Sequence, residues 1–348
     1  MNFKIQNREI GDGCPVFIVA ELSCNHQQKF ELAIKTIKMM KKAGADAVKL
    51  QTYTPDTITI DVKNKYFQIR QNTIWDNKTF YQLYQEAYTP WDWQPKLKKY
   101  AESIGLICFS SAFDNTAVDF LEKMKIPAYK VASFEITDIP LIEYIASKGK
   151  PVILSTGVAK LDDIKEAVNT CRRFGNKQIA IMKCTSAYPT PLEDVNLNTI
   201  SDLKKRFKVV VGLSDHTIDP SVPIAATALG VKIIEKHFII DRSLGGPDAQ
   251  FSLNADEFSE MVKGVRDTER ALGKNTYVLT QKMKKSREFA RSLFIVRDIL
   301  KNEKFTLENI RSVRPGFGLP PKFLWQVINK KAKRDIKRGT PLRWSLIK

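Results

Sequence analysis

Eight short apolar segments of β-strand character alternate with helical stretches over the first 272 residues, and this alternation constrains the fold more than any other feature. Runs such as Val152-Ile153-Leu154 and Val209-Val210-Val211 are apolar throughout, which is typical of parallel strands buried on both faces. We expect strands at residues 15–20, 47–51, 106–110, 128–132, 151–155, 178–184, 209–213 and 231–237.

Helical periodicity fills the gaps between these strands. Thr89 followed by Pro90, and Asn254 followed by Ala255, predict two of the helix starts. Eight βα units match the order of an α/β fold of the (β/α)8, or TIM barrel, class. A doubly wound open sheet is the alternative, but no Gly-x-Gly-x-x-Gly motif follows the first strand. We expect helices at residues 31–43, 91–103, 116–124, 140–147, 161–174, 197–207, 220–229 and 255–272.

The chain changes character after Leu272. We expect a barrel domain over residues 1–272, a polar, lysine-rich linker over 273–288 and a small β-rich domain over 289–348. In the last domain, residues 292–296 and 307–313 have strand character. Residues 57–80 follow the second strand as a long excursion. In a barrel such a loop lies at the catalytic face, so we expect it to shape the site.

The formal net charge of +18 is concentrated in the C-terminal part. Residues 273–348 hold 20 Lys and Arg against 5 Asp and Glu, a net of +15, which leaves +3 for residues 1–272. Such a field can steer an anionic small molecule or bind nucleic acid, but no nucleic-acid motif is present, so we expect no nucleic-acid partner. No apolar run approaches a membrane span, and five widely spaced cysteines fit a reducing compartment. We therefore expect a cytoplasmic protein with no membrane partner.

Polar side chains cluster where the expected strands end, which in a barrel is the catalytic face. The chain has three histidines, His26, His216 and His237, and each lies at a strand end. His216 and His237 follow the last two strands, which are neighbours, so their rings can converge on one divalent ion of the Mn, Zn or Co type. His26 lies across the barrel mouth and could bind the substrate or the metal.

Two lysines, Lys49 and Lys130, also point into the expected barrel mouth. A buried lysine is costly unless it is paired, so these two imply an anion. We favour a phosphorylated acid, with Glu21 or Glu135 as the general acid or base. Structural ion pairs of the lysines with Glu21 and Glu135, and a Schiff-base lysine, are the alternatives. The serines that would help to hold the acid are Ser111, Ser133, Ser155 and Ser214.

These strand ends together resemble the sialic acid synthase family, whose members join phosphoenolpyruvate to an amino sugar and carry a C-terminal antifreeze-like (SAF, β-clip) domain. The resemblance runs the full length of the chain. It is carried by Ala20-Glu21-Leu22-Ser23-x-Asn25-His26, Lys49-x-Gln51-Thr52, Tyr129-Lys130-x-x-Ser133-x-Glu135, Leu154-Ser155-Thr156-Gly157, Gly212-Leu213-Ser214-Asp215-His216 and Glu235-Lys236-His237-Phe238.

Finer motifs resemble the pseudaminic acid synthases within that family. The resemblance implies condensation of phosphoenolpyruvate with 2,4-diacetamido-2,4,6-trideoxy-altrose and water, giving pseudaminic acid and phosphate. An N-acetylneuraminate or legionaminate synthase, which differs in the sugar, is the alternative. The finer motifs are Gln51-Thr52-Tyr53-Thr54-Pro55-Asp56, Trp75-Asp76, Ala87-Tyr88-Thr89-Pro90-Trp91, Phe289-Ala290-Arg291-Ser292-Leu293, Ser312-Val313-Arg314-Pro315-x-Phe317-Gly318-Leu319 and Pro321-Lys322-Phe323.

The resemblance also implies roles for particular residues. It gives proton transfer to Glu21 and Glu135, it counts His26 among the catalytic residues as one that contacts the substrate or supports the site, and it places a divalent metal ion of the Mn, Mg or Co type on His216 and His237. The substrates would be bound by Lys49, Gln51, Ser111, Lys130, Ser133, Ser155, Ser186, Tyr188, Ser214, Asp248 and Arg314. Ser186 stands where many bacterial sialic acid synthases have Asn, which disfavours N-acetylmannosamine as the sugar.

The expected assembly follows from one residue of the C-terminal domain. Arg314 would reach the sugar site of the partner subunit, so the resemblance implies a domain-swapped homodimer. The alternative from another functional class is a basic binding protein whose barrel has no catalytic activity.

Overall fold

The computed structural model describes residues 2–70 and 74–348. They divide into two compact units, Met1–Gly273 and Lys274–Lys348. In the first unit, parallel strands close into a barrel, as predicted, in the order β10, β3, β4, β5, β6, β7, β8, β9. The barrel strands are β3 (Phe17–Glu21), β4 (Ala47–Thr52), β5 (Ile107–Ala112), β6 (Tyr129–Val131), β7 (Val152–Ser155), β8 (Ile179–Cys184), β9 (Val210–Asp215) and β10 (Ile233–His237).

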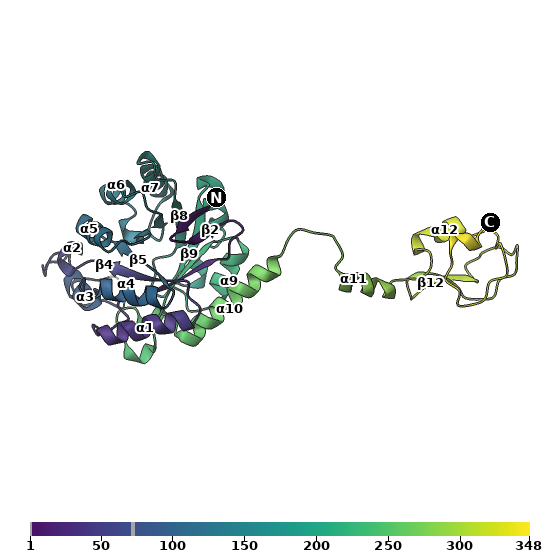
Figure 1. The fold of residues 1–348 in the computed structure, drawn as a ribbon, viewed down its shortest axis with the longest axis horizontal. Coiled ribbons are helices and arrows are strands. Elements are labelled where there is room, and N and C mark those ends of the chain that lie inside the picture. The colour runs from purple at the N-terminus through teal and green to yellow at the C-terminus, as the bar shows by residue number, and fades with distance from the viewer. Residues whose placement is uncertain (1, 71–73) are drawn as a thin grey trace. The chain divides into compact units, whose positions relative to one another are not determined.

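Helices surround the barrel, and one follows each strand (Figure 1). These helices are α1 (Phe30–Lys42), α4 (Gln94–Ser103), α5 (Asn115–Lys123), α6 (Ile139–Ser147), α7 (Leu161–Arg173), α8 (Thr199–Phe207), α9 (Ser221–Ala228) and α10 (Ala255–Leu272). Two further helices that we did not predict, α2 (Pro55–Ile58) and α3 (Phe80–Ala87), lie at the two ends of the predicted excursion after β4.

The two predicted helix starts had different outcomes. Asn254 caps α10 as expected, because its side chain accepts hydrogen bonds from the backbone amides of Asp256 and Glu257. The predicted start at Thr89 is wrong, since α4 begins at Gln94. The Thr89 hydroxyl does not cap a helix but lies 3.1 Å from His26 Nε2.

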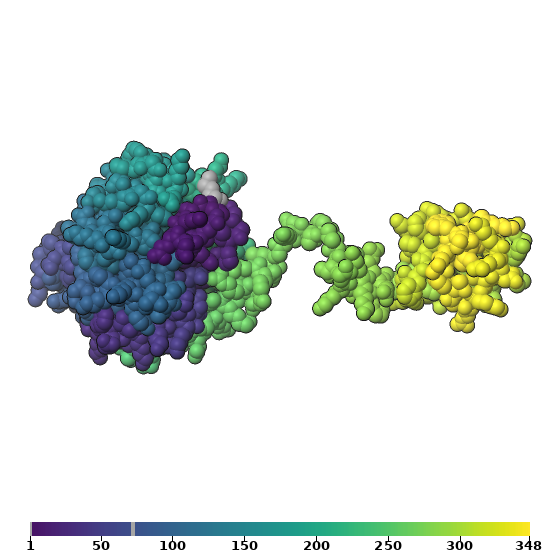
Figure 2. All heavy atoms as spheres, viewed as in Figure 1, coloured from purple at the N-terminus to yellow at the C-terminus, as the bar shows by residue number. Residues whose placement is uncertain are grey.

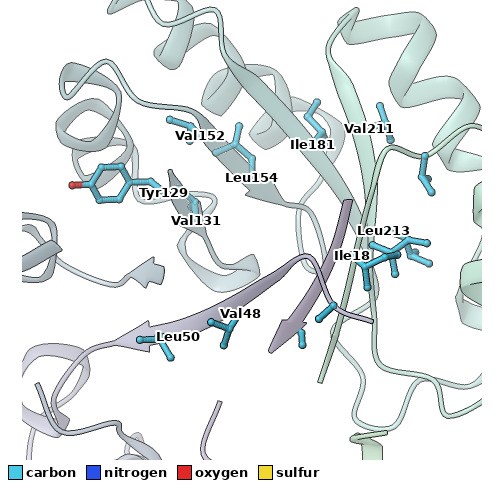
Figure 3. Packing of buried hydrophobic residues seen from close by; sticks show 14 of the residues in the cluster. Ile18, Val48, Leu50, Tyr129, Val131, Val152, Leu154, Ile181, Val211 and Leu213 are labelled. Carbon is cyan, nitrogen blue, oxygen red and sulfur yellow. The ribbon is translucent and has the colours of Figure 1, made fainter. Parts of the chain in front are cut away.

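The barrel strands follow a two-residue alternation that separates two cores. Outward side chains pack against the helices; Figure 3 shows Ile18, Val48, Val152 and others of this cluster on their strands. Inward side chains such as Phe109 fill the N-terminal half of the barrel interior. At the C-terminal ends of the same strands the inward side chains are polar. The two-residue alternation therefore places these polar groups at the barrel mouth.

A β-hairpin that we did not predict precedes the barrel. Strands β1 (Asn2–Ile5) and β2 (Arg8–Gly11) pair antiparallel, and the hairpin lies on the surface of the first unit in dark purple in Figure 2. Its side chains Phe3, Ile5 and Ile10 are buried in the same core as the inward residues of the barrel. The hairpin therefore covers the end of the barrel opposite the polar mouth.

The second unit has its own small core. Strands β11 (Ser292–Ile295) and β12 (Ile310–Val313) pair antiparallel where we predicted strands. Two short helices, α11 (Gln281–Ser286) and α12 (Leu324–Val327), belong to the same unit. Leu293, Phe305 and Leu342 are fully buried in a core of about a dozen apolar side chains, as expected for a domain of this size. Across residues 2–70 and 74–348, no helix combines the length and hydropathy needed to cross a bilayer.

Candidate active site

Four charged side chains meet inside the barrel mouth. Lys49 Nζ lies 2.6 Å from Glu21 Oε2 and 3.0 Å from Glu235 Oε1. Lys130 Nζ lies 2.9 Å and 3.1 Å from the two oxygens of Glu235. All four are buried, and each comes from an inward position of its strand, which explains how residues far apart in sequence converge.

Glu235 is the residue of this cluster that the sequence analysis missed. Its Oε1 also accepts a hydrogen bond from Ser214 Oγ at 3.1 Å. Although burial raises its pKa, the charges of Lys130 and Lys49 hold the pKa of Glu235 well below the ordinary value of a glutamate. Of the structural ion pairs that we had left open, the Lys49–Glu21 pair is found, whereas Lys130 pairs with Glu235 and not with Glu135.

Serine hydroxyls and one backbone amide surround the lysines. Ser111 Oγ lies 3.4 Å from Lys49 Nζ, and Ser133 Oγ accepts a hydrogen bond of 3.1 Å from the Gly157 amide. The hydroxyls of Ser155 and Ser186 are buried and have no hydrogen-bond partner among the described residues. Buried polar groups normally have partners, so these free hydroxyls indicate a polar ligand beside the lysines.

The two predicted metal ligands lie together. The rings of His216 and His237 have centroids 5.3 Å apart. His216 Nδ1 lies 3.1 Å from the Thr185 carbonyl oxygen, and His237 Nδ1 lies 3.4 Å from Asp248 Oδ2. A carbonyl or carboxylate on Nδ1 is the usual partner of a metal-binding imidazole, since it leaves Nε2 for the ion.

The imidazoles of His216 and His237 fit a divalent ion that keeps open coordination positions. Among the residues that the structure describes, no group of three His, Cys, Asp or Glu side chains is arranged to hold a metal. The protein would therefore supply two imidazoles, and water or substrate oxygens would supply the other ligands, as in catalytic rather than structural sites.

A cavity of about 310 Å³ opens beside the histidine pair. Several predicted site residues line it, namely the substrate-binding candidates Gln51, Ser133, Tyr188 and Asp248 and the proton-transfer candidate Glu135. The excursion after β4 contributes Ile58 and Trp75, as expected from its place in the chain. Tyr188 packs against His216 with ring centroids 4.5 Å apart, so the cavity and the histidines form one site.

Glu135 lies in a short 3-10 helix, Ser133–Glu135, directly after β6. Its carboxylate oxygen Oε2 is buried without a hydrogen-bond partner in the described part of the chain. Burial raises the pKa of Glu135 to about 7. A carboxyl group that titrates near neutral pH can both give and accept a proton, which suits a general acid or base.

His26 lies near this site but does not line the cavity. Its Nε2 lies 3.1 Å from Thr89 Oγ1, its Nδ1 accepts a hydrogen bond of 3.2 Å from the Gln28 amide, and its ring meets Trp93 edge to face. Burial lowers the pKa of His26 to about 4. The structure thus brings His216 and His237 together, and it places His26 in a separate, bonded position.

Arg314 belongs to the second unit, where it precedes Pro315 at the end of β12. The predicted reach of Arg314 into a partner's sugar site stays a prediction.

Comparison with known proteins agrees with this geometry. The sequence profile of the NeuB family matches residues 36–277, and the SAF domain profile matches residues 290–348. The chain belongs to the NeuB family. This membership confirms the resemblance to sialic acid synthases that the strand-end motifs indicated.

Among NeuB relatives, pseudaminic acid synthase of Campylobacter jejuni subsp. jejuni serotype O:2 is 46% identical over 94% of this chain and 95% of its own length. Pseudaminic acid synthase of Helicobacter pylori is 45% identical over 94% of this chain and 96% of its own. The crystal structure of spore coat polysaccharide biosynthesis protein SpsE from Bacillus subtilis is 37% identical, with a TM-score of 0.68 over 100% of this chain and 99% of that one.

Proposed function

We propose that the chain condenses phosphoenolpyruvate with 2,4-diacetamido-2,4,6-trideoxy-altrose and water to form pseudaminic acid and phosphate. The observation that carries the proposal is the lysine cluster beside the histidine pair, at one barrel mouth, in a chain 45–46% identical to pseudaminic acid synthases. The lysine cluster suits an anionic phosphate ester, and the histidine pair suits a metal-assisted reaction at a carbonyl.

Phosphoenolpyruvate would bind at Lys49 and Lys130. Their ammonium groups and the free hydroxyl of Ser155 can hold carboxylate and phosphate oxygens. Glu21 and Glu235 already offset the lysine charges, so the site is close to neutral before the substrate arrives. Binding a highly charged anion there would therefore be linked to proton uptake by neighbouring carboxyl groups.

The sugar would occupy the cavity with its aldehyde carbon toward the histidine pair. Carbon 3 of phosphoenolpyruvate attacks this carbon, and Glu135, which lines the cavity, donates a proton to the aldehyde oxygen. Water adds at carbon 2 and gives up a proton to Glu21. The tetrahedral intermediate then collapses: the carbon 2 hydroxyl becomes the ketone as the bond between carbon 2 and the phosphate oxygen breaks, and the hydroxyl proton leaves with the phosphate. Exchange with water returns Glu21 and Glu135 to their starting protonation. A divalent ion held by His216 and His237 would polarise the aldehyde as a Lewis acid.

A phosphate-release assay tests this function. We expect chelator-sensitive release that requires both phosphoenolpyruvate and the diacetamido altrose. A much higher kcat/KM with N-acetylmannosamine, or with the diacetamido sugar precursor of legionaminate, would overturn the choice of sugar. The proposal also predicts that borohydride traps no pyruvate adduct on Lys49 or Lys130, since no imine forms.

We also propose that the active unit is a homodimer in which Arg314 completes the sugar site of the partner subunit. Co-expression of an Arg314→Ala chain with a His237→Ala chain tests this arrangement. In a swapped dimer, half of the dimers are mixed, and each of these has one intact site, so about a quarter of the wild-type activity returns. If Arg314 acts on its own subunit, the mixture stays inactive.

A further inference from the structure

Two tyrosines of the cavity have hydroxyls that bond to none of the residues that the structure describes. Tyr53 is only 3% exposed and Tyr84 is half-buried, and both line the cavity beside the histidine pair. Within residues 2–70 and 74–348, neither phenol oxygen forms a hydrogen bond with another residue. Both tyrosines line the cavity and no described residue engages either hydroxyl, so both donors are available to a ligand.

These hydroxyls are set in an apolar wall. The Tyr53 ring packs edge to face against Tyr84 at 5.5 Å and against Phe113 at 5.1 Å between centroids. Leu83 and Ala87 of α3 line the same cavity. Burial raises the pKa of Tyr84 to about 12, so its phenol stays protonated and can donate. We call Tyr53, Leu83, Tyr84, Ala87 and Phe113 the tyrosine wall.

The chemistry of the tyrosine wall matches an acetamido group. Such a group combines a carbonyl oxygen, which accepts hydrogen bonds, with a methyl group, which gains from burial. A plain hydroxyl on the same carbon is two bonds shorter than the acetamido carbonyl, so it would not reach the tyrosine donors and would leave the apolar part of the wall without a contact. The wall is therefore better suited to an N-acetyl substituent than to an unsubstituted sugar carbon.

The position of the wall selects which acetamido group it meets. The sugar aldehyde must lie toward His216 and His237, whose rings contact Tyr188 and Phe251. In the described part of the chain, none of the rings of the tyrosine wall contacts either histidine. The wall thus forms a different side of the cavity from Tyr188 and Phe251, the rings that pack against the histidines.

We propose that the tyrosine wall is the subsite for the acetamido group on carbon 4 of the sugar, with Tyr53 and Tyr84 donating to its carbonyl oxygen. This inference rests on the proposed function and adds the residues that select a diacetamido sugar over a monoacetamido one. Tyr53 and Tyr84 are specificity-determining residues in this account, and the acetamido methyl packs against Leu83, Ala87 and Phe113.

Steady-state kinetics with two sugars tests the subsite. The diacetamido altrose is compared with an analogue that carries a hydroxyl in place of the acetamido group on carbon 4. Tyr84→Phe and Tyr53→Phe should each lower kcat/KM for the diacetamido sugar about three- to tenfold, the usual effect of one hydrogen bond between neutral groups. The loss for the analogue should be smaller, so the preference for the diacetamido sugar falls.

Tyr81→Phe is the matched control. Tyr81 lies on the same helix, α3, but its hydroxyl donates to Asp56 and it does not line the cavity, so the sugar preference should not change. An unchanged preference in both Tyr53→Phe and Tyr84→Phe would overturn the subsite while leaving the proposed function intact. Wild-type enzyme that turns over neither sugar would overturn the proposed function, and the subsite with it.

Discussion

Lys130 Nζ lies 2.9 Å and 3.1 Å from the two carboxylate oxygens of Glu235, and both residues are less than 5% exposed. The same carboxylate also contacts Lys49 and Ser214. One buried glutamate therefore offsets charge on two lysines that the proposed reaction needs for its anionic substrate. A buried ion pair of this kind is not a large net source of stability. Removing the glutamate, however, leaves the lysines charged and buried without it.

Glu235→Gln should lower the stability of the barrel unit. We expect its free energy of unfolding to fall by about 3–5 kcal/mol, because two buried ammonium groups lose their shared counter-charge. Urea unfolding followed by tryptophan fluorescence measures this change. Glu86→Gln breaks only the surface pair with Lys78 and should cost less than about 1 kcal/mol. Equal losses in the two variants would contradict this account of the cluster.

Glu135 should impose a pH dependence on turnover. Because burial raises its pKa to about 7, the protonated carboxyl is the main form below that pH and is lost above it. If Glu135 is the proton donor, kcat falls as the pH rises through about 7. Glu135→Gln cannot donate, so its rate should be about 100-fold or more below wild type and flat between pH 6 and 8. A wild-type rate that rises through this range would identify Glu135 as a base instead.

Asp248→Asn should weaken metal binding. Asp248 Oδ2 lies 3.4 Å from His237 Nδ1 and also accepts a hydrogen bond from Ser23 Oγ, so it orients the imidazole. Loss of such a carboxylate typically lowers metal affinity 10- to 100-fold. Titration of Mn²⁺ into chelator-treated protein, read by calorimetry, measures the affinity. Asp241→Asn alters a carboxylate that bonds the Ser243 amide on the same loop, and it should leave the affinity unchanged.

The alternation of the barrel strands explains why much of the site could be predicted. Lys49, Lys130 and Ser155 lie at inward positions near strand ends, and the barrel brings every such position to one mouth. Glu235 obeys the same rule, two residues before His237, and the alternation could have found it. Its role was missed because its partners lie on β4 and β6, and a sequence does not show which inward charges meet across a barrel.

Features outside the strands were harder to predict. Helix α3 has only eight residues and follows the predicted excursion, so it was missed although Thr79 and Gln82 form a capping box at its start that the sequence could have revealed. His26 follows a strand end, as catalytic residues do, but three residues of the loop after β3, Ser23, Gln27 and Gln28, have positive φ. Such local turns decide where a side chain points, and they do not follow from strand spacing.

His26→Ala tests whether this residue supports the site from outside the cavity. The variant leaves the Thr89 hydroxyl and the Gln28 amide without their partner, so the free energy of unfolding should fall by about 2–4 kcal/mol. Turnover should slow, whereas calorimetry should still find one metal ion per chain. His216→Ala, by contrast, should lose that ion. Loss of the metal in His26→Ala would mean that three protein ligands replace the two we infer.

The pKa of His26 adds a second measurement for the same variant. Burial holds it at about 4 in the folded protein, below the ordinary value of 6.5, so the unfolded chain takes up a proton first as the pH falls. The folded protein therefore loses stability between pH 6.5 and 4. His26→Ala has no imidazole to protonate, so its stability should fall less steeply over this range. An equally steep fall in the variant would show that His26 is not buried and neutral as the structure describes.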